Sequence, residues 1–197
     1  MSKKVLVISG TISPKDKSYS WELSKKFIEE YTKNNPKDEL IYLDLNHVPM
    51  AQKSLTEQNF ATYFNEEDAM KYIQQLREVD KIVISSPMHN FNVPGIVKNY
   101  LDHILLANET FSYKYSKKGD AIGLLTNLTV QILTTQGAPF GWYMWGNHTD
   151  YLRGTWEFVG AKVVEPILLA GTKVSGLTPT QAVDNIVEDI TEAAKKF

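Results

Sequence analysis

The sequence of 197 residues predicts an α/β fold, a doubly wound five-stranded parallel sheet with helices on both faces. Two observations favour it. Strand-like and helix-like segments alternate along the chain, which is the order that parallel strands with crossover helices require. The strand-like segments are also apolar at nearly every position, as expected for strands buried on both faces. No repeat, low-complexity stretch or linker interrupts this pattern, so we expect one domain over residues 1–197.

The strand candidates are short runs rich in β-branched and aliphatic residues. The first of them, Val5 to Ile8, is ended by Ser9 and Gly10. In chain order the five candidates are residues 5–8, 40–43, 81–85, a segment of 121–135 that ends near Thr134 and Thr135, and 163–169.

Apolar residues recur at helical spacing between these runs, and capping signals mark several helix ends. The predicted helices run from about Ser20 to Pro36, over 65–78, from Pro94 to 105, around 151–159 with a stop at Gly160, and onward from a capping box at Thr178 and Gln181. In the last helix we expect Ala182, Ile186 and Ile190 to share a buried face.

One segment, residues 45–65, is longer than an ordinary connection between a strand and a helix. Such long connections are usually functional or disordered. Its three aromatic residues, Phe60, Tyr63 and Phe64, make disorder the weaker interpretation.

Composition excludes several classes of protein. The net charge of −2 argues against a dedicated nucleic-acid binder, and the 43% hydrophobic content argues against a disordered chain. The absence of cysteine excludes disulfides, thiolate metal sites and cysteine nucleophiles. No apolar run is long enough for a signal peptide or a membrane span. We therefore expect a cytoplasmic protein without membrane or nucleic-acid partners.

Ligands of open α/β sheets bind beyond the carboxyl ends of the strands, and three loops lie there in this sequence. The first loop, residues 10–20, has neither G-x-G-x-x-G nor a Walker lysine, but it places the hydroxyls of Thr11, Ser13, Ser18 and Ser20 just before a helix. Hydroxyls and free N–H groups at a helix start suit a phosphate. The alternative is that Ser18 or Ser20 only caps the helix.

The second loop, residues 86–94, is stiffened by two prolines and carries Asn90 and Asn92, whose amides both donate and accept hydrogen bonds. That pattern suits the edge of a planar heterocycle, which Met88 and Phe91 would flank. The alternative is a rigid turn in which the asparagines satisfy the loop's own backbone.

The third loop begins at Thr134 and Thr135 and contains Gly137, which permits close approach of backbone to a ligand. The aromatic run 140–145 follows it, and such a run forms core, a platform for a planar ligand or a subunit interface. The four histidines show no metal-ligand spacing, and no serine lies in a G-x-S-x-G nucleophile elbow. We expect no metal site.

These loops resemble those of the FMN-dependent NADH:azoreductases, also described as NADH:quinone oxidoreductases, which have a flavodoxin-like fold. The segment from Pro87 to Pro94 reads P-M-H-N-F-N-V-P, close to the family pattern P-M-Y-N-F-N-x-P. The stretches 97–102 and 110–113 are close to its L-K-N-Y-x-D and T-F-x-Y patterns. Ser18-Tyr19-Ser20 resembles the S-x-S phosphate loop, and Asp44-Leu45 resembles the end of the second strand. The similarity covers essentially the whole chain.

The resemblance implies a set of residues around one FMN. The cofactor-binding residues would be Thr11, Ser18, Tyr19 and Ser20 at the phosphate, and Pro87, Met88, His89, Asn90, Phe91, Thr135, Gln136 and Gly137 around the isoalloxazine. Phe60, Phe111 and Trp142 would wall a substrate slot shared by the two subunits of a homodimer. Two departures stand out. His89 replaces the usual tyrosine, where it could tune the flavin, and Thr135-Gln136-Gly137-Ala138 replaces S-R-G-G, with loss of a positive charge.

The resemblance also implies a reaction, in which bound FMN takes a hydride from NADH and passes two electrons to a quinone or an aromatic azo compound. No protein nucleophile is expected. The alternatives are an electron carrier of flavodoxin type and a flavin-free α/β hydrolase. A carrier would be shorter and more acidic than this chain.

Overall fold

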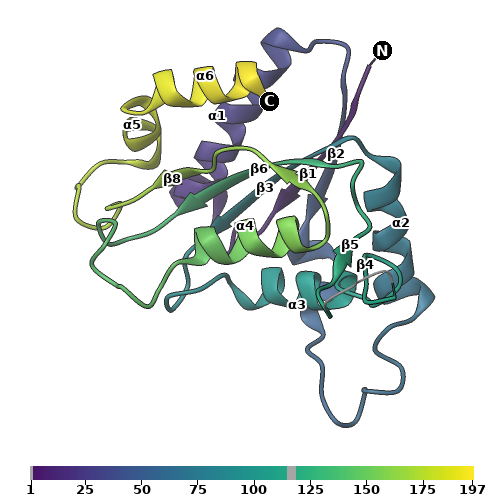
Figure 1. The fold of residues 1–197 in the computed structure, drawn as a ribbon. Coiled ribbons are helices and arrows are strands. Elements are labelled where there is room, and N and C mark those ends of the chain that lie inside the picture. Colours follow the sequence, from purple (N-terminus) through teal and green to yellow (C-terminus); the bar gives the residue numbers. More distant parts are fainter. Residues whose placement is uncertain (1, 115–118) are drawn as a thin grey trace.

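The computed structural model describes residues 2–114 and 119–197, and Figure 1 shows a central sheet enclosed between two layers of helices. Every strand pairing in this sheet is parallel. The flavodoxin-like strand order, 2-1-3-4-5, is present, and the predicted fold class is confirmed. In spatial order the strands are β2 (Glu39–Asp44), β1 (Lys4–Ser9), β3 (Lys81–Pro87), β6 (Thr129–Thr135) and an edge made of β7 (Lys162–Val163) and β8 (Ile167–Leu169).

The strands are apolar throughout because each face of the sheet has its own core. In β1, Leu6 and Ile8 belong to one buried cluster, whereas Val5 and Val7 belong to the other. The first cluster lies against α2 (Lys71–Glu78), α3 (Gly95–Ile104) and α4 (His148–Phe158), and the second lies against α1 (Tyr19–Asn34), α5 (Pro179–Asp184) and α6 (Val187–Lys196). The two helical layers of Figure 1 are these two groups.

The observed helix ends follow local capping chemistry. Ser18 and Thr178 cap α1 and α5 as the sequence predicts. Pro94 stands at the N-cap of α3 rather than inside its first turn. Helix α4 begins at His148, ahead of the expected position, because the Asn147 side chain caps it. Across the described residues, no helix is long and apolar enough to cross a bilayer.

The helix expected over 65–78 consists of two parts. A π-helical turn, η4 (Glu66–Met70), leads directly into α2. The side chain of Asn65 accepts hydrogen bonds from two backbone N–H groups at the start of this turn. The cap therefore explains the start of the segment, which the apolar spacing alone placed only approximately.

The prediction of a single strand over 163–169 is wrong, because the edge strand is divided into β7 and β8. Between their paired stretches the edge holds one residue more than β6 does, so a β-bulge separates them. Pro166 lies in this bulge and has no N–H group for the ladder. The side-chain amide of Gln131 in β6 donates instead to the Glu165 carbonyl, at 3.1 Å.

The prediction of a single final helix is also wrong. Helices α5 and α6 are separated at Ile186, whose φ of −118° and ψ of 19° are not helical. The apolar residues Ala182, Ile186 and Ile190 are spaced by four. In a straight helix, residues spaced by four point in directions that differ by about 40°, so three of them in succession cannot all face the sheet equally. The break keeps Ala182 and Ile190 buried in the same cluster, while Ile186 is only partly buried.

The long excursion over 45–65 is ordered against α3. It opens with two 3₁₀ turns, η2 (Leu45–His47) and η3 (Pro49–Gln52). The Asn99 side chain of α3 donates to the Ala51 carbonyl at 2.8 Å and accepts from the Ser54 hydroxyl at 3.0 Å. Tyr63 stacks on His103 with ring centroids 3.8 Å apart, and burial raises the pKa of Tyr63 to about 12. The remaining loop projects past α3 at the bottom of Figure 1.

A small antiparallel ribbon of β4 (Phe111–Ser112) and β5 (Ile122–Gly123) is an element that the periodicity did not predict. Gly123 packs directly on the turn after α4. A Cβ at this position would lie 2.1 Å from the Gly160 nitrogen, and Gly160 itself has φ of +97°. The contact between ribbon and turn therefore depends on two glycines.

We predict that Gly123→Ala lowers the free energy of unfolding by more than about 2 kcal/mol, because backbone must move to admit the methyl group. Gly154→Ala in α4 is the matched control. Nothing lies within 4 Å of a Cβ there, so the helix should gain about 0.5–1 kcal/mol. Urea denaturation measures both, and equal stability of the two variants would contradict the close packing.

Candidate functional site

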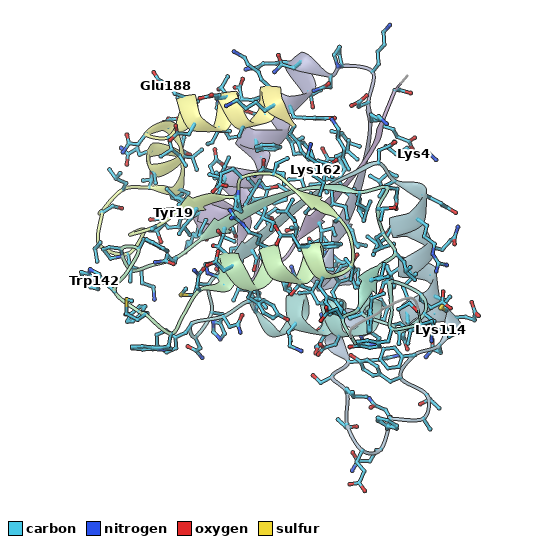
Figure 2. All side chains as sticks on the ribbon, in the orientation of Figure 1. Lys4, Tyr19, Lys114, Trp142, Lys162 and Glu188 are labelled. Carbon is cyan, nitrogen blue, oxygen red and sulfur yellow. The ribbon has the colours of Figure 1, made fainter. Side chains whose placement is uncertain are left out.

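The three loops singled out from the sequence meet at one cavity of about 250 Å³ beyond the carboxyl ends of β1, β3, β6 and β8. Figure 2 shows Tyr19, at the start of α1, and Trp142 on this side of the molecule. The cavity is lined by eight of the predicted cofactor residues, Ser18, Tyr19, Ser20, Pro87, Met88, Thr135, Gln136 and Gly137.

A buried cluster of hydroxyls forms one wall. Ser20 Oγ lies 2.9 Å from Thr11 Oγ1 and 3.1 Å from Ser18 Oγ. Ser18 also caps α1, so the capping role and the cavity-lining role are compatible. The Tyr19 hydroxyl donates to the Leu177 carbonyl at 2.6 Å and braces the loop before α5. Hydroxyls and the N–H groups at the start of α1 therefore make this wall suitable for an anion.

The second loop contains a strained turn. Its ends are joined by His89 N–H donating to the Asn92 carbonyl at 2.7 Å and by the reverse bond at 3.2 Å. Between them Asn90 has φ of 45° and Phe91 has φ of 72°. Asparagine tolerates this region, but phenylalanine rarely adopts it, and strain of this kind concentrates at ligand sites. The sequence pattern gave no indication of the strain.

The aromatic loop after β6 is exposed. Trp142 is 62% exposed and Met144 is 87% exposed, so the loop as a whole is not core. The ring of Phe91 lies edge-on to Tyr143 and Trp145, with centroids 4.9 Å and 5.5 Å away. A platform for a planar ligand and a subunit interface are the two interpretations that remain.

The third loop is held by its own hydrogen bonds and by the turn after β8. The Gln136 side chain donates to the carbonyls of Ala138 at 2.9 Å and Pro139 at 3.2 Å. Its amide is therefore used to shape the loop. The Gln136 carbonyl accepts from the Thr172 hydroxyl at 3.2 Å, and the Gly137 carbonyl accepts from Lys173 N–H at 2.9 Å.

Ser13, one of the hydroxyl residues that the sequence places in the first loop, also lines the cavity. Three further lining residues were absent from the sequence prediction, namely Lys17, Thr172 and Lys173. Lys17 belongs to a short turn, η1 (Lys15–Lys17), within the first loop. Thr172 and Lys173 follow β8, the last strand. The rule that ligands bind beyond strand ends could have indicated this fourth loop, but its sequence carries no binding motif.

The three predicted substrate residues are not brought together within one chain. Phe60 is 71% exposed in the loop that projects past α3, and Phe111 packs against Phe158 with centroids 4.9 Å apart. Neither lines the cavity. Trp142 belongs to the exposed aromatic loop beside it. Within residues 2–114 and 119–197, no group of acidic or histidine side chains could hold a metal ion.

The strand order and a cavity beyond the carboxyl ends of the strands define a flavodoxin-type α/β protein. A model of the flavodoxin-like fold matches residues 3–194, and the chain belongs to this family. It is 57% identical to the FMN-dependent NADH:quinone oxidoreductase 1 of Mesoplasma florum, over 98% of this chain and 99% of that protein.

Solved structures show the same fold. An azoreductase from Bacillus anthracis strain Sterne superimposes with a TM-score of 0.82 and 23% identity over the full length of both chains. An FMN-dependent NADH-azoreductase from Bacillus anthracis strain Ames Ancestor, solved in complex with FMN, superimposes with a TM-score of 0.74, at 25% identity over 98% of each chain.

A buried histidine, His148, is the first residue of α4 and lies near the backbone of Thr135 in the third loop. His148 is 1% exposed, and its ring nitrogens have no hydrogen-bond partner among the described residues. Burial lowers the pKa of the imidazole from 6.5 to about 4, an effect that the nearby Thr135 backbone offsets only in part. The folded protein therefore holds His148 neutral at pH 5, where the unfolded chain protonates it.

We predict that stability falls as the pH drops from about 6.5 toward about 4, because the unfolded state then binds the extra proton. At pH 5, His148 should account for a loss of about 2 kcal/mol relative to pH 7. Denaturation of wild type and His148→Gln at both pH values measures it. His103, whose pKa burial also lowers, is common to both proteins. If the stability of the two proteins depended equally on pH, His148 would not be the source of the loss.

Proposed function

We propose that this protein is an FMN-dependent oxidoreductase that transfers two electrons from NADH to quinones and reductively cleaves aromatic azo compounds. One observation carries the proposal: the predicted phosphate loop, Met88 and Gly137 line a single cavity in a chain 57% identical to a protein named for the quinone activity. The FMN-bound azoreductase of the same fold supports the cofactor and the azo substrates.

The residues present fit FMN. The cluster of Thr11, Ser18 and Ser20 hydroxyls at the start of α1 matches a phosphate group. The same cavity is lined by Pro87 and Met88 of the second loop, against which a planar ring would lie. FMN, when bound, supplies the hydride acceptor and the two-electron donor of the reaction.

The strained turn, which follows the cavity-lining Met88, is our candidate for the donors to the ring. Met88 N–H donates to the Thr135 carbonyl, and His89 N–H is used inside the turn. Within the described chain, the Asn90 and Phe91 N–H groups have no acceptor. We propose that these two amides face the side of the ring where negative charge gathers on reduction, in the manner of an oxyanion hole. The positive φ at both residues sets the direction of these amides.

The exposed aromatic loop, with Phe91, would form the open side of the slot in which the nicotinamide and the acceptor stack in turn. This ping-pong order needs one exposed ring face and no protein nucleophile. Stacking on aromatic surfaces selects for planarity, which quinones and azo compounds share. NADH as donor agrees with the predicted cytoplasmic location.

Anaerobic stopped-flow mixing of FMN-loaded protein with NADH tests the function. The flavin absorbance should bleach at least as fast as steady-state turnover, and an added quinone should restore it. Flavin that stays oxidised would favour an electron carrier. Protein that binds no FMN when FMN is supplied would favour a flavin-free α/β enzyme.

We also propose a homodimer with the slot at the subunit interface. Phe60 and Phe111 do not line the cavity of their own chain, so they can wall a slot only if a second copy approaches. The exposed Trp142 and Trp145 offer apolar surface for that contact. Analytical ultracentrifugation should show a dimer at micromolar concentration, and a monomer at every concentration would contradict it.

A further inference from the structure

The cavity that the candidate phosphate loop lines also contains positive charge that the sequence pattern had not located. In the third loop, Gln136 stands where the resembled family has arginine, and its amide is used within the loop. The cavity is nevertheless lined by two lysines, Lys17 from the first loop and Lys173 from the turn after β8.

The backbone around Lys173 is fixed against the third loop. Gly171 N–H donates to the Ala138 carbonyl at 2.9 Å, and Lys173 N–H donates to the Gly137 carbonyl at 2.9 Å. A third backbone bond runs from Thr172 N–H to the Gln136 carbonyl, at 3.2 Å. The backbone of Lys173 is therefore held in a fixed position beside the third loop.

The side chain of Lys173 lies across Gly137. A Cβ on residue 137 would come within 2.8 Å of Lys173 Cδ and 2.9 Å of Cγ. Gly137 does not have a positive φ, so its backbone conformation does not require glycine. The space that the Lys173 stem occupies explains the lack of a side chain at this position. The stem therefore packs on the bare backbone at 137, and Lys173 lines the same cavity as Ser18 and Ser20.

The charge balance of the cavity favours a dianion. No acidic residue lines it. Among the described residues, Lys17 and Lys173 form no salt bridge, whereas the neighbouring Lys15 lies over the Trp21 ring with its Nζ 4.1 Å from the centroid. Two lysines, three hydroxyls and a helix N-terminus thus lie close together, a combination that matches a phosphate monoester.

We propose that Lys173 binds the 5′-phosphate of FMN, so that a residue after the last strand supplies the positive charge that the third loop lacks. This inference rests on the proposed function, because it takes FMN as the ligand. It adds a phosphate-binding residue from a fourth loop and gives Gly137 a specific purpose, which is to make room for the lysine.

Affinities of the apoprotein for FMN and for riboflavin, which lacks the phosphate, test the proposal by quenching of flavin fluorescence. Lys173→Met keeps the stem and removes the charge. It should weaken FMN binding about tenfold and change riboflavin binding less than about twofold, since charge-assisted bonds to phosphate are worth at least that factor. Lys173→Arg should restore most of the FMN affinity.

Lys15→Met is the matched control, because it removes one charge from the adjacent loop without touching the cavity lining. It should change the affinity for FMN less than about twofold. Added salt should weaken FMN binding by wild type more steeply than by Lys173→Met, because the variant has lost one phosphate-facing charge. Thermal melts of the variants confirm that they are folded.

Equal weakening of FMN and riboflavin by Lys173→Met would overturn the proposal, because the lysine would then act on the ring or on the loop. Unchanged FMN affinity would also overturn it, and so would a changed midpoint potential with an unchanged FMN-to-riboflavin ratio. These binding results are independent of turnover. A protein that binds FMN through Lys173 but does not oxidise NADH would contradict only the proposed function.

Discussion

The hydrogen bond from Met88 N–H to the Thr135 carbonyl, at 2.7 Å, continues the parallel ladder between β3 and β6 beyond its last paired residues. On the other side of β3, Gly10 N–H donates to the Ser85 carbonyl at 2.8 Å and extends the β1–β3 ladder in the same way. The loops that form the cavity therefore leave the sheet in a fixed register. A slip of one residue in either ladder would turn each loop to the opposite face.

The start of the first loop depends on close packing below it. A Cβ on Gly10 would lie 2.3 Å from a Val97 methyl group of α3 and 2.9 Å from the Ser85 carbonyl. This position must therefore remain free of a side chain for β1 to turn toward α1 at this point. Backbone hydrogen bonds also close the strained turn and fix the lysine of the fourth loop against the third, whereas the hydroxyl cluster is joined through its own side chains.

Sequence patterns predicted the parts of the site whose chemistry is local. Ser18 and Ser20 are recognisable because helix caps and phosphate loops both use hydroxyls at a helix start, and the second loop is recognisable by its prolines and asparagines. Lys173 could not be predicted in this way. It is remote in sequence from Gly137, and only the pairing of the two turns brings them together. The strain at Phe91 is equally hidden, because its residue type favours other backbone conformations.

The sequence by itself determined the α/β class, the approximate places of the strands along the chain and three of the four loops at the cavity, because periodicity, caps and turn residues act over a few neighbouring positions. Tertiary structure alone decided the bulge opposite Gln131, the break at Ile186 and the placement of Phe60 and Phe111 away from the cavity of their own chain. These features arise from the fit of edge strand, helix and excursion against a sheet already formed. Contacts between remote residues set that fit, and local sequence patterns do not record them.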